Sequence, residues 1–353
     1  MKISTDFLGG NILIKGQDGD TFYLDCELRD TEGEWFYWAF CAQGFEGRTI
    51  KFVFEKPWIG YFGPAISSDL NHWEWLNSGD DHSFEYTFGE NEDKVYFAHH
   101  LLYHPDRFAS FARKHGLEIK EFCNSRKGRS VPMVEFGEGD RLVILAARHH
   151  ACESTGSYAL EGTIEGLIKN PINNLRYICV PFVDYDGVVD GDQGKNRFPH
   201  DHNRDYPADA GAIYPEVKQI REIADNNDVF LAFSFHSPWH KGGLNDKAFL
   251  PQMTLDKLDR LVEFGNTFES CITQEAFKYE QKNDYPPNTD WNKVGMPCFE
   301  TYLLNNKGNY VTTSVELAYF GEYNNRITQD NTVEFGRCFA KAMKKYVDIV
   351  DSK

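Results

Sequence analysis

The first hundred residues contain short runs in which hydrophobic and polar positions alternate. These runs lie at residues 11–15, 21–28, 34–40, 49–54, 84–88 and 94–98. Glycine, aspartate and asparagine separate them, and alternation with a period of two is typical of strands that bury one face. Residues 1–103 are therefore predicted to form an N-terminal antiparallel β-sandwich domain.

The periodicity changes at His104. Phe108 and Phe111 are separated by helical spacing within residues 106–114, so a short helix is predicted there. We therefore place a domain boundary directly before His104 and predict a second domain over residues 104–353.

Beyond this boundary, long apolar runs alternate with helical segments. The predicted strands are residues 142–148, 177–183, 229–235 and 312–317, and the predicted helices are about residues 155–169 and 215–225. Nearly continuous apolar strands between helices indicate a sheet that is buried on both faces. The expected fold class is α/β, with a mixed, mostly parallel sheet flanked by helices and preceded by the β-sandwich.

Charge narrows the range of partners. The 353 residues include 37 Lys+Arg and 54 Asp+Glu, for a net charge of −17. Nucleic acids and anionic membranes are bound by basic patches, and this chain is nowhere basic over more than a few residues. We therefore expect neither partner, and the sequence does not indicate an oligomeric state.

Targeting features and cysteine usage point to a cellular compartment. No apolar stretch approaches the ~20 residues that span a bilayer, and the N-terminus lacks the apolar run of a secretory signal. The eight cysteines include no CxxC pair, so reduced thiols are expected rather than disulfides or a cysteine zinc site. A cytoplasmic protein is expected.

Two of the buried strands end at histidines. His149, His150 and Glu153 follow the strand at 142–148, and His236 ends the strand at 229–235. The carboxyl ends of strands in open α/β sheets meet at one crevice. His150, Glu153 and His236 would form a His₂Glu set that leaves a fourth position for water, as in catalytic zinc sites. His149 is the competing ligand, but on an extended strand end it projects to the opposite side.

Two further segments carry candidate chemistry. Asn203 and Arg204 lie between the two histidine segments and are suited to hold a carboxylate through charge-assisted hydrogen bonds. Glu316 is the single acid in the apolar strand at 312–317, a setting that suits a general base.

The order of these motifs resembles the M14 (carboxypeptidase A) family of zinc carboxypeptidases, and most closely its cytosolic carboxypeptidase subfamily. The segments that carry the resemblance are residues 147–153 (ARHHACE), 181–188 (PFVDYDGV), 201–204 (DHNR), 35–38, 54–57 and 96–105. The resemblance covers nearly the whole chain. It implies a β-sandwich followed by a zinc peptidase domain, in agreement with the domain division predicted from periodicity.

The resemblance also implies roles for the candidate residues. One Zn²⁺ per chain would be held by His150, Glu153 and His236. Glu316 would be the general base, and the clamp for the substrate's terminal carboxylate would be Asn203 and Arg204. The implied function is a metallocarboxypeptidase that hydrolyses the C-terminal peptide bond of peptides or proteins.

The match departs from the family at one catalytic position, and a second position has two candidates. Where the subfamily has an arginine near the oxyanion, this chain has Gly194, and either Arg197 or Lys195 is available from the same loop. We favour Arg197, because a guanidinium is a fixed charge with a fork of donors. For the mobile tyrosine over the substrate we choose Tyr285, with Tyr302 second.

Other functions compete with this one. A zinc amidohydrolase or deacylase acting on N-acyl amino acids or modified small molecules would keep the metal and Glu316 but need less of a peptide groove. An adhesion or carbohydrate-binding protein would leave the metal set without purpose. Preference for an acidic terminal residue would require a cation such as Lys282, Lys293 or Lys307 in the pocket, and the net charge leans against acidic protein substrates.

Overall fold

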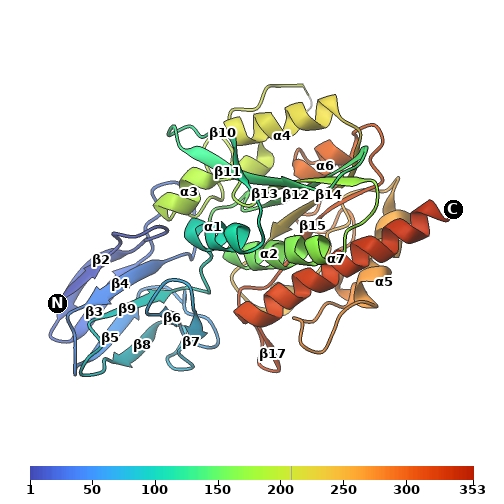
Figure 1. The fold of residues 1–353 in the computed structure, drawn as a ribbon. Helices are drawn as coiled ribbons and strands as arrows, with labels where there is room; N and C mark the ends of the chain where they lie inside the picture. The colour runs from blue at the N-terminus through green and yellow to red at the C-terminus, as the bar shows by residue number, and fades with distance from the viewer. Residues whose placement is uncertain (208) are drawn as a thin grey trace.

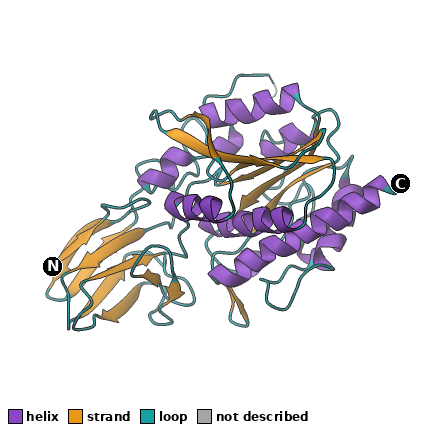
Figure 2. Ribbon diagram, viewed as in Figure 1, coloured by secondary structure: helices purple, strands orange, loops and turns teal. Residues whose placement is uncertain are grey.

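A computed structural model describes residues 1–207 and 209–353 of the chain. Two small sheets of N-terminal strands lie beside a larger sheet that has helices on both faces (Figure 1, Figure 2). None of the described helices is long and apolar enough to cross a membrane. All eight cysteines are free thiols in the structure.

The N-terminal strands form a five-stranded sheet, β1-β4-β9-β6-β7, and a four-stranded sheet, β2-β3-β5-β8. Their bounds are β1 Lys2–Ser4, β2 Leu13–Asp18, β3 Thr21–Asp25, β4 Ala39–Gln43, β5 Thr49–Phe54, β6 Ala65–Ser67, β7 Glu74–Trp75, β8 Ser83–Thr87 and β9 Lys94–Ala98. Aromatic rings join the two sheets: the ring of Phe52 in β5 lies 5.1 Å from that of Phe40 in β4 and 5.3 Å from that of Phe97 in β9. The five-stranded sheet is antiparallel throughout, as predicted.

Two details of this region differ from the sequence prediction. β3 and β5 pair in parallel rather than antiparallel, because β4, which separates them along the chain, belongs to the other sheet. The predicted strand at 34–40 is regular only from Ala39, and before it the buried ring of Phe36 packs against Trp239 and His240. The division into two domains at His104 stays a prediction.

The larger sheet has the order β10-β11-β13-β12-β14-β15. Its strands are β10 Ile119–Asn124, β11 Ser130–Phe136, β12 Arg141–Ala147, β13 Leu175–Val180, β14 Val229–His236 and β15 Val311–Glu316. The last four pair in parallel, and β10 and β11 add an antiparallel edge. This confirms the predicted fold class. A short hairpin, β16 Gly321–Glu322 and β17 Asn325–Arg326, follows β15.

Helices cover both faces of this sheet (Figure 1). They are α1 Pro105–Lys114, α2 Ser154–Lys169, α3 Tyr185–Asp190, α4 Pro215–Asn226, α5 Leu258–Glu269, α6 Phe299–Leu304 and α7 Gln329–Asp351. In β12, Val143 and Leu145 belong to the core shared with α2, α5 and α7, whereas Leu142 and Ile144 belong to the core shared with α4 and α6. Burial on both sides explains why the central strands lack hydrophobic alternation.

Three buried histidines lie where the N-terminal sheets meet the rest of the molecule. His240 donates from Nε2 to the Pro57 carbonyl (3.0 Å), so its Nδ1 accepts from Nε2 of His99 (2.8 Å). Nδ1 of His99 then accepts from Nδ1 of His100 (2.9 Å). Each ring uses one donor and one acceptor, which is the neutral imidazole. Burial lowers the pKa of His240 to about 3 and that of His99 well below its ordinary value.

This histidine chain predicts a loss of stability in acid. A histidine that titrates near pH 6.5 when unfolded and much lower when folded stabilises the protein above its unfolded pKa, and that stability is lost as the pH falls. Between pH 6.5 and 5 we expect a loss of about 2 kcal/mol for each buried imidazole. Thermal unfolding at a series of pH values measures this loss.

The matched variant is His240→Gln, whose amide can both accept from His99 and donate to Pro57 without titrating. We expect its stability to depend less on pH in this range, whereas His82→Gln, at an exposed position, should follow the native profile. If the His240 variant had the native pH profile of stability, the three hydrogen-bonded histidines would not be the source of the acid sensitivity.

Candidate functional site

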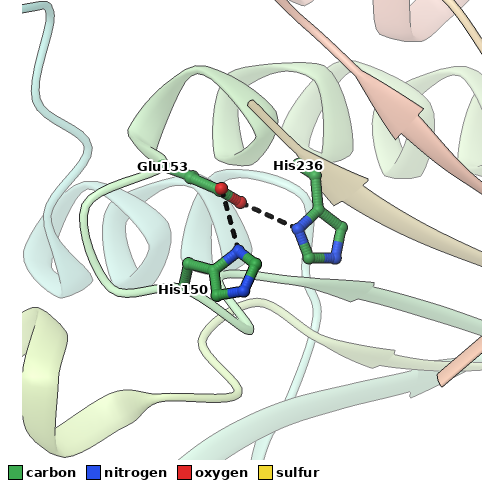
Figure 3. Close-up of side chains that lie close together, drawn as sticks. All are labelled: His150, Glu153 and His236. Carbon is green, nitrogen blue, oxygen red and sulfur yellow. Dashed lines mark hydrogen bonds and ion pairs between the residues drawn. The ribbon is translucent and has the colours of Figure 1, made fainter. Parts of the chain in front are cut away.

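His150, Glu153 and His236 converge at the carboxyl ends of β12 and β14 (Figure 3). Nδ1 of His150 lies 2.9 Å from one carboxylate oxygen of Glu153, and Nδ1 of His236 lies 2.8 Å from the other. All three side chains are largely buried. The pairing of strands β12 and β14 brings the two sequence segments together.

A tight turn after β12 presents His150 and Glu153. Arg148 begins this turn with a φ of 62°, in the left-handed region that side chains rarely adopt. Its buried guanidinium donates from Nε to the Ala151 carbonyl (2.7 Å) and from Nη1 to the Tyr103 carbonyl (3.2 Å). These bonds hold the turn closed and point His150 back over the sheet edge.

The donor set fits a zinc ion. Two imidazole nitrogens and a carboxylate oxygen lie within 4.8 Å of one another, and zinc in proteins is bound by nitrogen and oxygen ligands of this kind. Nε2 of His150 lies 3.6 Å from Asp201, as expected for an acid that orients a ligand histidine. Nε2 of His236 has no hydrogen-bond partner among the described residues.

The competing ligands point elsewhere. His149 is buried, with Nδ1 2.8 Å from the Ser234 hydroxyl and Nε2 2.9 Å from the Tyr206 hydroxyl. Cys152 lies 3.5 Å from the Tyr319 hydroxyl. Neither belongs to the group of ligand atoms formed by His150, Glu153 and His236, which we call the trio.

Glu316 lies beside the trio at the end of β15. It is the direct partner of His236 in the parallel pairing of β14 and β15, and it is buried. Burial raises the pKa of Glu316 to about 7, although nearby His236 opposes this shift. By contrast, His150, Lys195 and His236 outweigh burial and keep the pKa of Glu153 well below its ordinary value. One acid is therefore held as a carboxylate while the other can exchange a proton near neutral pH.

The trio and Glu316 open into a cavity of about 510 Å³. Asn203 and Arg204, in a short 3-10 helix (His202–Arg204), line the same cavity. Arg204 forms none of the ion pairs found among the described residues, and the long hydrogen bond from its Nη1 to the Asn203 carbonyl (3.4 Å) leaves donors of the guanidinium for an anion. The structure thus brings the predicted clamp and the predicted metal ligands to one site.

The loop after α3 brings Lys195, rather than Arg197, to the trio. The ammonium of Lys195 lies 2.6 Å from Glu153 and lines the cavity. Arg197 instead forms ion pairs with Asp30 (3.0 Å), Asp184 (2.6 Å) and Asp192 (2.9 Å), and lines a separate pocket. The preference for Arg197 as the cation at the reacting centre therefore does not match its position.

N-terminal residues hold the loop that carries Lys195. Asp30 accepts hydrogen bonds from the backbone nitrogens of Gln193 (3.0 Å) and Gly194 (2.9 Å) as well as from Arg197. Thr31 donates to the Lys195 carbonyl. Since these contacts span more than 160 residues of chain, the N-terminal region helps to position Lys195.

The two tyrosine candidates, Tyr285 and Tyr302, lie in different places relative to the cavity. Tyr285 lines the cavity, donates from its hydroxyl to Asp290 and stacks on Trp291 with ring centres 5.4 Å apart. Tyr302 donates to Asp225 (2.7 Å) and is not among the residues that line the cavity. The structure therefore favours Tyr285 over Tyr302 as a residue that can meet a substrate.

Two further cavity residues are not among the predicted site residues. Trp35 reaches the cavity from the N-terminal region, with its ring 5.0 Å from that of Trp239. Glu300, in α6, is fully buried and lines the same cavity. Trp35 lies in segment 35–38, which carries the family resemblance, but its place in the cavity, like that of Glu300, comes from packing between distant segments.

Comparison with known proteins gives distant relatives in sequence. No family model matches the chain. An uncharacterised protein of Zymomonas mobilis is 25% identical over 257 residues, which is 67% of this chain and 67% of that protein. Human cytosolic carboxypeptidase 1 is 25% identical over 170 residues, which is 40% of this chain but only 14% of the human protein.

Solved structures match along nearly the whole chain. A metallo-carboxypeptidase from Burkholderia cenocepacia superposes with a TM-score of 0.82 at 16% identity, covering 99% of both chains. A metallo-carboxypeptidase from Pseudomonas aeruginosa, solved in complex with (2-guanidinoethylmercapto)succinic acid, gives 0.81 at 17% identity with the same coverage. The likeness inferred from the motifs is thereby confirmed at the level of the fold.

Proposed function

We propose that this chain, which has the fold of the metallo-carboxypeptidases, is a zinc-dependent carboxypeptidase that releases single residues from the C-terminus of peptides or proteins. The observation that carries the proposal is the joint presence of the trio, Glu316 and the unpaired Arg204 around one cavity. We further propose one zinc ion per chain and action in the cytoplasm. The similarity to human cytosolic carboxypeptidase 1 supports the last point.

The residues of the trio would hold the metal, and the surrounding residues would transfer a proton and stabilise negative charge. Zinc bound by His150, Glu153 and His236 would polarise the scissile carbonyl and lower the pKa of water. Glu316 would accept a proton from the attacking water and deliver it to the leaving amine. The ammonium of Lys195, beside the trio, would stabilise negative charge that develops on the carbonyl oxygen.

Arg204 and Asn203 would define which bond is cut. A guanidinium binds a carboxylate through two parallel hydrogen bonds, so a chain terminus held by Arg204 places only its last peptide bond beside the trio. The compound bound by the Pseudomonas protein is a succinic acid and carries two carboxylates, which supports an anion site in proteins of this fold. Tyr285 would then cover the bound residue from the loop at the cavity wall.

The test compares peptides of one sequence with free and with amidated C-termini, incubated with the zinc-loaded protein and followed by mass spectrometry. We expect loss of one residue from the free peptide and no cleavage of the amide, because the amide cannot pair with Arg204. Equal cleavage of both peptides would contradict the proposal. Cleavage of small N-acyl amino acids, with both peptides left intact, would instead indicate a deacylase.

A further inference from the structure

We infer that Glu300 selects a basic side chain, lysine or arginine, at the C-terminal position of the substrate. The inference rests on the proposed carboxypeptidase function, since it names the class of residue that the same cavity would accept. It assigns a specificity-determining role to a residue outside the metal and clamp groups.

The first ground is the environment of the Glu300 carboxylate. The residue has 0% exposure, and neither of its oxygens has a hydrogen-bond partner among the described residues. No lysine, arginine or histidine in the described part of the chain lies within ion-pair distance of it. Buried polar groups are nearly always paired, because an unpaired buried charge is strongly unfavourable. A cation supplied by a ligand would satisfy this carboxylate.

The second ground is position. Glu300 follows Phe299, whose backbone nitrogen donates to the side-chain oxygen of Asn203 (3.3 Å). This bond ties the start of α6 to the segment that carries Asn203 and Arg204, and Glu300 and both clamp residues line one cavity. The terminal carboxylate and the side chain of a bound residue share one Cα. A residue held at Arg204 therefore places its side chain within the cavity that Glu300 also lines.

The rest of the cavity wall suits a basic residue better than an acidic one. Apolar side chains that could pack along a lysine or arginine stem are Leu244, Phe249, Met253 and Met296. Among the described residues, the lysines and arginines that line the cavity are Lys195 and Arg204, and Lys195 is paired with Glu153. An acidic terminal side chain would meet the Glu300 carboxylate with no free cation beyond the clamp.

The lysines considered for an acidic preference do not reach the cavity. Lys282 pairs with Glu280 (3.0 Å), Lys293 donates to the Asn288 carbonyl (3.2 Å), and Lys307 is exposed. None of the three lines the cavity. The net charge of −17 adds a long-range attraction for basic peptides.

The test measures kcat/KM of the zinc-loaded protein on peptides that differ only in the last residue: lysine, arginine, norleucine or glutamate. We expect lysine and arginine to exceed norleucine by ~10–100-fold, the gain of a buried ion pair at one position, and glutamate to be the poorest. Glu300→Gln should remove the basic preference, so that the lysine, arginine and norleucine peptides are cleaved with similar kcat/KM. Glu275→Gln, at an exposed carboxylate, should keep the native ranking.

A binding arm keeps the inference testable without turnover. Calorimetry with free arginine and free norleucine should show tighter binding of arginine to the native zinc-loaded protein, even if Glu300→Gln fails to fold. Cleavage of norleucine peptides with no preference for basic ends would overturn the role of Glu300 and leave the carboxypeptidase intact. No cleavage of any peptide would contradict the carboxypeptidase, and calorimetry would still decide the role of Glu300.

Discussion

Replacing Glu316 by glutamine is expected to lower kcat by ~10²–10⁴-fold, the usual contribution of a general base, while zinc content and folding stay native. Glu316 is the ionisable group beside the trio with a pKa raised to about 7 by burial, so it can both take and return a proton. Glutamine keeps the size and hydrogen-bonding shape of the side chain but cannot accept the proton. The measurement is the steady-state rate on a peptide with a free C-terminus, with zinc measured in the same preparation.

The control for this variant is Glu138→Gln, which neutralises an exposed carboxylate in the loop between β11 and β12. It should keep the native rate. A Glu316 variant that retained more than about a tenth of native kcat would fall outside the general-base range and remove Glu316 from that role.

Replacing His236 by alanine is expected to weaken zinc binding by more than ~100-fold, which exceeds the loss typical for partners outside the ligand set. His236 supplies one of the three ligand atoms that lie within 4.8 Å of one another, and Glu153 would be left with His150 alone. Competition with a chromophoric chelator measures the affinity, and circular dichroism checks the fold.

His149→Gln is the matched control for the His236 variant. His149 stacks on His236 with ring centres 5.5 Å apart, but its nitrogens face Ser234 and Tyr206. The glutamine variant should therefore keep near-native zinc affinity. If it lost zinc as strongly as His236→Ala, the identity of the three ligands would need revision.

Much of this site can be predicted from the sequence, because buried parallel strands have a recognisable pattern of continuous apolar residues. The apolar runs of β12, β14 and β15 lack alternation since both faces are covered by helices, and each run ends at or shortly before a candidate site residue. Strands of this kind end at one edge of the sheet. The convergence of His150, His236 and Glu316 is therefore predictable from strand ends, whereas Glu153 is placed by its three-residue spacing from His150.

The sheet edges and the N-terminal pairing are less predictable. β10 and β11 are partly exposed and lack the continuous apolar runs of the central strands, so they are absent from the predicted strands. The parallel pairing of β3 with β5 depends on β4 joining the other sheet, a choice made by tertiary packing. The buried aromatic run around Phe36 belongs to the contact with Trp239 and His240, which no local pattern reveals.

The choice between Lys195 and Arg197 shows the same limit within the site. Donor geometry favours arginine in general, but Arg197 forms ion pairs with Asp30, Asp184 and Asp192 and so lies away from the trio. Asp30 is 167 residues distant from Arg197 in sequence. Left-handed backbone at Gly194 and Asn196 turns Lys195 toward Glu153 instead. Glu300 is likewise recognisable only by its burial without a partner.

The most direct test of the central claim is a zinc titration of chelator-treated protein, followed by release of the terminal residue from a peptide with a free C-terminus. The expected result is no release without metal and a rise that saturates at one zinc per chain, as a single His₂Glu site requires. Undiminished release after complete removal of the metal would contradict the assignment of this chain as a zinc carboxypeptidase.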